Sequence, residues 1–199
     1  MADAVAVRPA ASIILWRNDP KGPRVLMGQR GAAAVFMPSK YVFPGGRVDP
    51  GDHSDGHLSP ECQVRLAQHC PPDAPSSTAL VGCAARELFE ETGLTLAPAT
   101  PMLFMFRAIT PAGSPRRFDA RFFLVSADQI SGDPDDFTHA TDELSHLHWI
   151  GLREALHLDL PFITEIILAE VSAILSGHTQ PGVPFFDNSG PVPTFLRLI

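Results

Sequence analysis

Apolar and polar positions follow one another along this chain in a way that predicts a mixed set of strands and helices. Runs rich in β-branched and aromatic residues, bounded by Pro, Gly and Asp, are typical of buried strands. Strands are expected over residues 10–16, 24–30, 102–109, 117–126 and 147–150. The first two flank a turn rich in Pro and Gly, so we expect them to pair antiparallel.

Helical periodicity is clear over residues 78–92. The apolar stripe of this helix consists of Val81, Ala85, Leu88 and Phe89. One of residues 76–78, all Ser or Thr, supplies the N-cap, and Gly93 supplies a left-handed C-cap. We expect the stripe to pack on a sheet, with acidic side chains on the opposite face.

Three further segments complete the expected architecture. A short helix is predicted over 59–69 with Pro60 at its first position, another begins at 152–156, and 162–175 is amphipathic. From about residue 177 the chain is rich in Pro and Gly, which favours an irregular tail. Mixed strands with internal and C-terminal helices predict an α/β fold, a three-layer α/β/α sandwich with a mixed sheet.

The helix over 78–92 also carries a cluster of charges. Glu87, Glu90 and Glu91 are three and four residues apart, so they share one face, beside Arg86. Like charges at this spacing repel by about 0.2–0.5 kcal/mol per pair, so a positive partner is expected. A hard divalent cation suits carboxylate oxygens. The alternative is a solvated acidic face at the end of a helix.

A glycine-rich turn precedes this helix. Residues 41–43 form a strand-like run that enters Pro44-Gly45-Gly46, where glycines permit a tight turn or a close backbone approach. Together the turn and the helix resemble the Nudix box, which joins a glycine and an acid to the pattern Arg-Glu-apolar-x-Glu-Glu-x-Gly. The matching positions are Gly46, Asp52, where the family usually has Glu, Arg86, Glu87, Glu90, Glu91 and Gly93.

An insertion at about 53–77 splits this box. A subgroup of Nudix hydrolases carries such an insertion and includes relatives of the mammalian peroxisomal coenzyme A diphosphatase. The resemblance extends from about residue 10 to 174 and includes the segments 43–49, 116–123 and 142–149. We expect the insertion to lie near the substrate entrance, with a surface excursion as the alternative. Glu61 inside it is an alternative to Asp52 as the first acid.

The resemblance implies a single Nudix hydrolase domain over residues 1–199 that uses Mg²⁺ or Mn²⁺. The three helix glutamates and Gly46 are implied to hold the metal. Arg86 is expected to orient the glutamates through charge-assisted hydrogen bonds. The general base is either a box glutamate or an acid on a later loop, where Glu143 is the candidate and Asp142 stands behind it. An exposed loop acid is the alternative for Glu143.

Arginines at the start of a predicted strand are candidates for substrate binding, since guanidinium forks pair well with phosphate oxygens. They are Arg116, Arg117 and Arg121. The alternative is a surface ion pair with Asp119. Aromatic side chains are also candidates for stacking on a base, although core packing is the favoured role for them. These are Phe36, Tyr41 and Phe106.

The resemblance favours hydrolysis of the diphosphate bond in coenzyme A or acyl-coenzyme A, giving 3′,5′-ADP and a phosphopantetheine. A diphosphatase for ADP-ribose or NADH is the first alternative. A Nudix-fold module that binds a ligand without cleaving it is the second, and only Asp52 favours it. An acidic structural protein with a coincidental box is the third.

Composition narrows the partners. The 199 residues are 45% hydrophobic with a formal net charge of −7, so long nucleic acid is not an expected partner. Three cysteines are too few for a disulfide framework, and reduced thiols predict a cytoplasmic protein. The N-terminus does not resemble a signal peptide and no apolar run is long enough to span a bilayer, so no membrane is expected. A homodimer is a further expectation.

Overall fold

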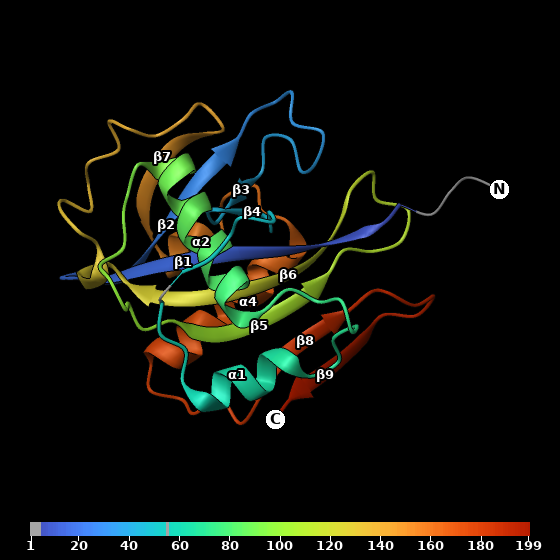
Figure 1. The fold of residues 1–199 in the computed structure, drawn as a ribbon. Helices are drawn as coiled ribbons and strands as arrows, with labels where there is room; N and C mark the ends of the chain where they lie inside the picture. The colour runs from blue at the N-terminus through green and yellow to red at the C-terminus, as the bar shows by residue number, and fades with distance from the viewer. Residues whose placement is uncertain (1–4, 55) are drawn as a thin grey trace.

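The computed structural model describes residues 5–54 and 56–199, and its strands form one mixed sheet (Figure 1). Within those residues the strand order is β3-β2-β1-β6-β5-β8-β9, with β4 paired to β1 and β7 paired to β2. The pairs β1–β6 and β5–β8 are parallel, and the others are antiparallel. The strands are β1 (Val7–Asp19), β2 (Gly22–Arg30), β3 (Tyr41–Val42), β4 (Gly45–Arg47), β5 (Leu103–Ile109), β6 (Arg117–Ser126), β7 (Leu144–Gly151), β8 (Val183–Asp187) and β9 (Thr194–Leu198).

Helices cover both faces of this sheet (Figure 1). They are α1 (Pro60–Ala67), α2 (Ser77–Thr92), α3 (Leu152–Ala155) and α4 (Phe162–Leu175). One core cluster joins Leu88 of α2 to Ile13 and Phe123 of the sheet. A second cluster joins Ile167 of α4 to Ile14. Neighbouring residues of β1 thus face opposite layers, as strand alternation requires, and the predicted three-layer α/β/α sandwich is confirmed.

The sheet opens where β1 separates from β2. β1 pairs with β2 only from Trp16 to Asp19, whereas Ala10, Ala11 and Ser12 pair with β4. Gly45 of β4 has φ +159°, and a Cβ there would lie 2.2 Å from the Ser12 hydroxyl oxygen, so only glycine fits. The predicted glycine turn is therefore a short strand that fills the gap between β1 and β2.

The box helix forms where the sequence predicts it. The Ser76 hydroxyl accepts a hydrogen bond from the backbone N–H of Ala79, and Gly93 ends α2 in the left-handed conformation. The predicted stripe is wrong in one member, because Phe89 is 52% exposed. Burial instead includes Glu87 and Glu91, which are 9% and 1% exposed because β4 covers this face of the helix.

No described residue of the insertion lines the large pocket described below, which favours the alternative of a surface excursion over a place near the substrate entrance. It folds as α1, confirming the predicted helix, and lies beside the C-terminal strands (Figure 1). The Gln68 side chain bonds to both backbone groups of Ile199, and Arg107 of β5 donates to the Gln68 and His69 carbonyls. Glu61 pairs with Arg65 in α1, away from Asp52.

The predicted irregular tail is also corrected. Residues 183–187 and 194–198 form an antiparallel hairpin, and β8 adds to the sheet beside Arg107 and Ala108 of β5. Phe185 and Leu198 are buried in the core, which explains why apolar positions override the Pro and Gly content here. None of the helices that the structure describes is both long and apolar enough to cross a membrane.

Candidate active site

Arg86 is the centre of a network of carboxylates at the turn between β4 and α2. Its Nε and Nη2 donate to the two Asp52 carboxylate oxygens at 2.7 and 3.1 Å. Its Nη1 donates to Glu87 Oε1 at 2.9 Å and to Glu90 Oε2 at 3.0 Å, and Nη2 also reaches the Arg47 carbonyl. Asp52 thus holds the guanidinium with two hydrogen bonds. Burial raises the pKa of Asp52, but the contact with Arg86 lowers it, and the pKa is lowered overall.

Glu91 is the most deeply buried carboxylate of the network. Its Oε2 accepts a hydrogen bond from the Gly45 backbone N–H at 2.8 Å, while its Oε1 is buried without a partner among the described atoms. Burial raises the pKa of Glu91 to about 8, and the nearby charges of Glu87 and Glu143 act in the same direction. A buried carboxylate oxygen without a donor is costly, which makes Glu91 a candidate for function.

Glu87 lies against the glycine turn. A Cβ at Gly46 would be 2.3 Å from Glu87 Oε1, so glycine is required for the carboxylate to approach the backbone. Burial raises the pKa of Glu87, and the hydrogen bond and charge of Arg86 lower it. Glu90 is more open, with a side chain 49% exposed. The three glutamates therefore surround the end of β4 at different depths.

The donor set suits a hard divalent cation. In the part of the chain that the structure describes, no three His, Cys, Asp or Glu side chains are already gathered as ligands. The Glu87 and Glu90 carboxylates point instead at Arg86 Nη1, which holds them together. The unpartnered oxygen of Glu91 and the close approach of Glu87 to Gly46 provide carboxylate oxygens of the kind that Mg²⁺ and Mn²⁺ prefer.

A pocket of about 890 Å³ extends from these carboxylates. Its floor consists of alternate residues of neighbouring strands, including Ser12 of β1 and Phe122 of β6. Glu87, Glu90 and Glu143 line it. Glu143 has a side chain 57% exposed and lies 3.6 Å from Arg30 Nη2. Asp142 is exposed and, within the described residues, is not part of the pocket wall.

The three arginines expected to bind substrate separate in the structure. Arg116 and Arg117 line the large pocket. The expectation that Arg121 binds substrate is corrected. Arg121 is 1% exposed, and it bonds to both the carboxylate and the backbone carbonyl of Asp119. Arg121 is thus buried in an ion pair within β6, whereas Arg117 lines the pocket from the first position of the strand.

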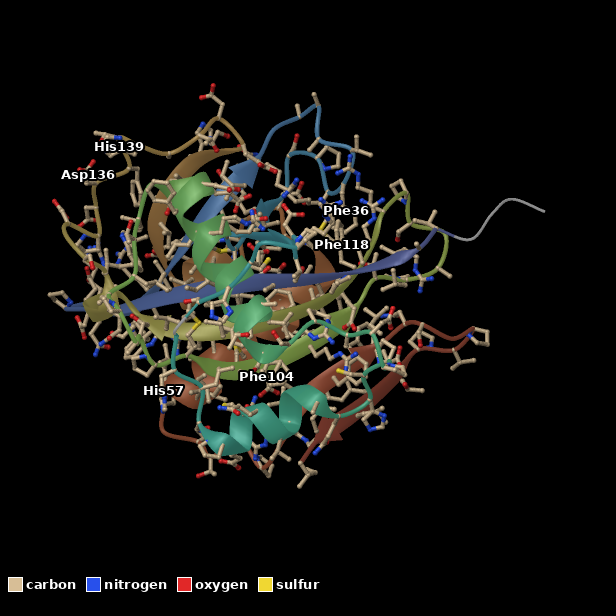
Figure 2. All side chains as sticks on the ribbon, in the orientation of Figure 1. Phe36, His57, Phe104, Phe118, Asp136 and His139 are labelled. Atoms are coloured by element: carbon tan, nitrogen blue, oxygen red, sulfur yellow. The ribbon has the colours of Figure 1, made fainter. Side chains whose placement is uncertain are left out.

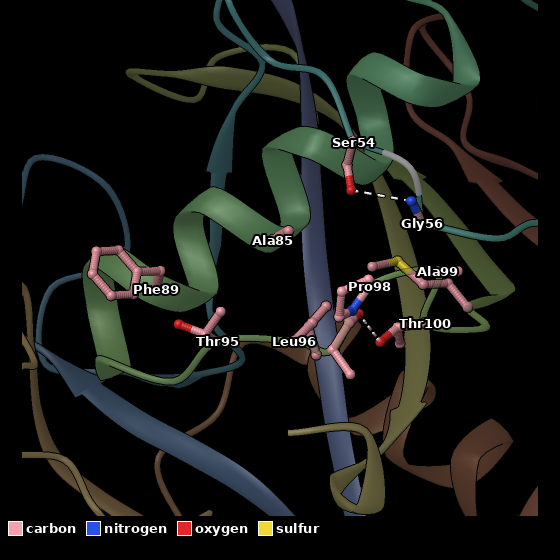
Figure 3. Close-up of a pocket in the computed structure, with 11 residues that line it drawn as sticks. Ser54, Gly56, Ala85, Phe89, Thr95, Leu96, Pro98, Ala99 and Thr100 are labelled. Carbon is pink, nitrogen blue, oxygen red and sulfur yellow. Dashed lines mark hydrogen bonds between the residues drawn. The ribbon is translucent and has the colours of Figure 1, made fainter. Parts of the chain in front are cut away.

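A second cavity of about 280 Å³ lies on the other side of α2, between Ala85 and Phe89 and the loop 95–100 (Figure 3). Figure 3 draws two hydrogen bonds at this cavity, and each joins residues of one loop. The Ser54 hydroxyl accepts from the Gly56 backbone N–H, and the Thr100 hydroxyl donates to the Ala97 carbonyl. Its described lining includes no acid, base or thiol, so it contributes nothing to the chemistry of the carboxylates.

The match to known proteins agrees with this geometry. Residues 75–171 match the sequence model of the NUDIX domain. They are a NUDIX domain. The match begins near the end of the insertion, so the glycine turn of the Nudix box lies outside the matched range, although β4 places Gly46 against Glu87. The box is therefore split in the sequence and reunited in the fold.

Relatives and solved structures support the same assignment. The chain is 31% identical over 166 residues to putative nudix hydrolase 7 of Caenorhabditis elegans, covering 75% of this chain and 53% of that protein. It is 30% identical over 155 residues to the acyl-coenzyme A diphosphatase NUDT19 of Gallus gallus, covering 62% of this chain and 38% of that protein. The chain thus spans about half or less of the length of these relatives.

Among solved structures, a NUDIX hydrolase from Alicyclobacillus acidocaldarius matches with a TM-score of 0.63 and 24% identity, over 88% of this chain and 98% of that one. A C. elegans Ap4A hydrolase matches with a TM-score of 0.56 and 18% identity, over 86% of this chain and 99% of that one. The predicted Nudix fold is confirmed.

Sequence reasoning missed several residues of the Nudix site. Arg30 and Arg47 line the pocket, but isolated arginines on or after a strand carry no signal of their own. Phe118 was part of a segment noted for its arginines, yet it forms the pocket wall together with Phe36. The pocket therefore draws on loops and strands whose proximity depends on sheet pairing alone. Of the other aromatic candidates, Phe106 is buried in the core.

Proposed function

We propose that this Nudix domain is a metal-dependent hydrolase that cleaves a diphosphate bond in a nucleotide derivative, with coenzyme A or acyl-coenzyme A favoured. The observation that carries the proposal is the buried pair Glu87 and Glu91 against Gly45 and Gly46, at one end of the pocket of about 890 Å³. Buried carboxylates are costly, and beside a cavity of a size typical for small-molecule ligands they suit the hydrolysis of a diphosphate.

In this proposal Glu87, Glu90 and Glu91 hold Mg²⁺ or Mn²⁺, with the backbone of Gly46 close beside them. Such an ion supplies charge neutralisation for the phosphate oxygens and a lower pKa for bound water. Arg86 orients Glu87 and Glu90 through its Nη1 bonds. Glu90 is exposed enough to exchange this bond for another partner.

Glu143 is the proposed general base. It lines the same pocket as Glu87 and Glu90, from the loop before β7. Burial raises the pKa of Glu87 and of Glu91, and the charge of Glu143 adds to this effect. Arg30 Nη2 lies 3.6 Å from Glu143 Oε1, and Arg30 also lines the pocket. A base at this position takes a proton from the attacking water without being a ligand itself.

The preference for coenzyme A derivatives has two supports. One relative is an acyl-coenzyme A diphosphatase at 30% identity. The pocket also has a polar end at the glutamates and an apolar side with Phe122, Phe162 and Phe186, which suits a substrate with both phosphates and an apolar arm. ADP-ribose or NADH remains the alternative substrate class, and binding without cleavage is the other alternative.

We also propose that residues 1–199 act as one domain. Strands from β1 to β9 share one sheet, and the C-terminal hairpin contributes Phe185 and Leu198 to the same core cluster as α2. The insertion docks on that hairpin through Gln68.

Product release from a substrate panel tests the function. The panel contains coenzyme A, acetyl-coenzyme A, ADP-ribose, NADH and a diadenosine polyphosphate, with Mg²⁺ or Mn²⁺. Glu91→Gln is expected to lower kcat by about 10²–10³-fold, the scale seen when one group that stabilises a transition state electrostatically is removed. Glu165→Gln on the exposed side of α4 is the matched control and should retain full turnover.

Cleavage of coenzyme A derivatives ahead of the rest supports the favoured substrate. Selective cleavage of ADP-ribose or NADH replaces it with the alternative. If Mg²⁺ stabilises the protein against heat but no compound is cleaved, the protein is a binding module and the proposal fails.

A further inference from the structure

The end of the large pocket away from the glutamates is cationic, although the chain as a whole carries a formal charge of −7. Arg8, Arg116 and Arg117 line this end. The acids of the pocket wall are Asp49, Glu87, Glu90 and Glu143, which belong to the Nudix box and the loop before β7. Arg8 and Arg116 are exposed, and neither has a carboxylate within ion-pair distance among the described residues.

The sheet register brings these arginines together. Arg8 of β1 is the register partner of Phe118 of β6, and Val7 is the partner of Arg117. Arg117 is held in place because its Nε donates to the Thr110 carbonyl at 3.0 Å and its Nη2 to the Asn188 carbonyl at 3.1 Å. Two carbonyl bonds fix the guanidinium without neutralising its charge, which favours an anionic ligand.

An aromatic wall stands beside the cations. Phe36, on the loop between β2 and β3, contacts Phe118 edge to face with ring centroids 5.2 Å apart (Figure 2). Both rings are only half-buried and both line the pocket. The Phe36 carbonyl accepts a hydrogen bond from Arg30 Nε, which ties the loop to the strand that also approaches Glu143. Aromatic faces of this kind stack on nucleobases.

The two ends of the pocket are separated along β1. Ala11 is the register partner of Gly46, the residue against Glu87, and Arg8 is three residues earlier on the same strand. At about 3.3 Å per residue the separation along the strand is roughly 10 Å. A nucleoside fits between a diphosphate at the glutamates and a second anion at the arginines.

We propose that Arg8, Arg116 and Arg117 form a subsite for a phosphate monoester on the nucleoside of the substrate, and that Phe36 and Phe118 pack against its base. The inference rests on the proposed function and narrows it. It selects a nucleoside that carries a phosphate outside the diphosphate chain, as coenzyme A does at its 3′ position and ADP-ribose and NADH do not.

Coenzyme A and 3′-dephospho-coenzyme A differ only in that phosphate, so their comparison tests the subsite. Wild-type enzyme should cleave coenzyme A with a kcat/KM at least about 10-fold higher, mainly through KM, because a charged hydrogen-bond partner is lost from the poorer substrate. The double variant Arg8→Ala, Arg116→Ala should lose this discrimination by becoming worse on coenzyme A alone. Arg153→Ala, exposed on α3, is the matched control and should keep it.

Equal kcat/KM for the two substrates in the wild type overturns the subsite but leaves the diphosphatase intact. So does an equal loss on both substrates in the double variant. If neither substrate is cleaved, the proposed function fails, and the subsite is decided by thermal shift with adenosine 3′,5′-bisphosphate against 5′-AMP. Stronger stabilisation by the bisphosphate that disappears in the double variant supports it, and equal stabilisation refutes it.

Discussion

Two buried groups of charges on this molecule differ in one respect: whether both oxygens of the buried carboxylate have partners. Under β5 and β6, the Asp119 carboxylate binds Arg107 Nε and Nη2 at 2.8 Å and lies 3.0 Å from Arg121 Nη1. At the glycine turn, Glu91 is as deeply buried but has one oxygen without a partner. Arg121 Nε is also buried without a partner, so the contrast is between the two carboxylates. A carboxylate with both oxygens bonded to arginines builds structure, whereas one with a free oxygen retains the capacity to bind.

The surroundings of the two groups support this contrast. Arg107 also bonds to the Gln68 and His69 carbonyls and lies over the Phe185 ring, 4.3 Å from its centroid. Arg107 thus contacts β6, the insertion and β8. Glu87 and Glu90 share a single arginine and face a pocket. The first group therefore joins the insertion and the C-terminal hairpin to the sheet, and the second lies beside the large pocket.

Replacing Asp119 gives the largest expected change in stability. Asp119→Ala leaves Arg107 and Arg121 buried without their carboxylate, which should cost about 3–5 kcal/mol of the free energy of unfolding. Urea unfolding followed by circular dichroism measures this change. Asp135→Ala removes an exposed partner of Arg17 and should cost about 0–1 kcal/mol as the control. A loss at Asp119 as small as at Asp135 would contradict a structural role for the cluster.

The second prediction concerns pH and the other group. In metal-free protein the pKa of Glu91 is about 8, above the ordinary value of 4.5. The folded state therefore holds a proton that the unfolded state releases, so the stabilisation is fully present below about pH 4.5 and is lost as pH rises through about 8. At about 1.4 kcal/mol per pKa unit, the effect is of the order of a few kcal/mol.

Thermal unfolding between pH 5 and pH 9 with a chelator present measures this effect. Glu91→Gln should flatten the decline in stability with pH, while Glu165→Gln should leave it unchanged. Asp52 has a lowered pKa and contributes with the opposite sign, since its stabilisation is lost as pH falls. Asp52 titrates at a lower pH than Glu91, so it does not produce the predicted loss of stability as pH rises. A wild-type profile that is level between pH 5 and pH 9 would contradict an unsatisfied Glu91.

The sequence predicted the local parts of both regions and missed their assembly. Ser76 and Gly93 bound α2 because caps act within a few residues. Periodicity placed Phe89 in the core, because the pattern of one helix carries no information about which side β4 covers. For the same reason the burial of Glu87 and Glu91 was not foreseen. Motif order named these glutamates, but only the pairing of β4 with β1 explains their depth.

Long-range pairing decides the remaining differences. Arg121 looked like a phosphate ligand because it follows Arg116 and Arg117, yet it is buried within β6, where it pairs with Asp119. Arg107 carried no signal, because its partners are 12 residues along the chain and in an insertion. The Pro and Gly content of the tail favoured coil. Burial of Phe185 in the core offsets the entropy lost when this segment becomes ordered.

The smallest predicted effect tests whether the insertion belongs to the structural region alone. Gln68 imitates a strand residue, since its amide bonds to both the N–H and the carbonyl of Ile199. Gln68→Ala should lower the free energy of unfolding by about 0.5–1.5 kcal/mol, because these bonds are exposed to water. The kcat/KM for the preferred substrate should not change, since no described residue of 53–77 lines the large pocket. If kcat/KM falls while the free energy of unfolding is unchanged, the insertion affects the site of the glutamates. The view that it belongs to the structural region alone is then wrong.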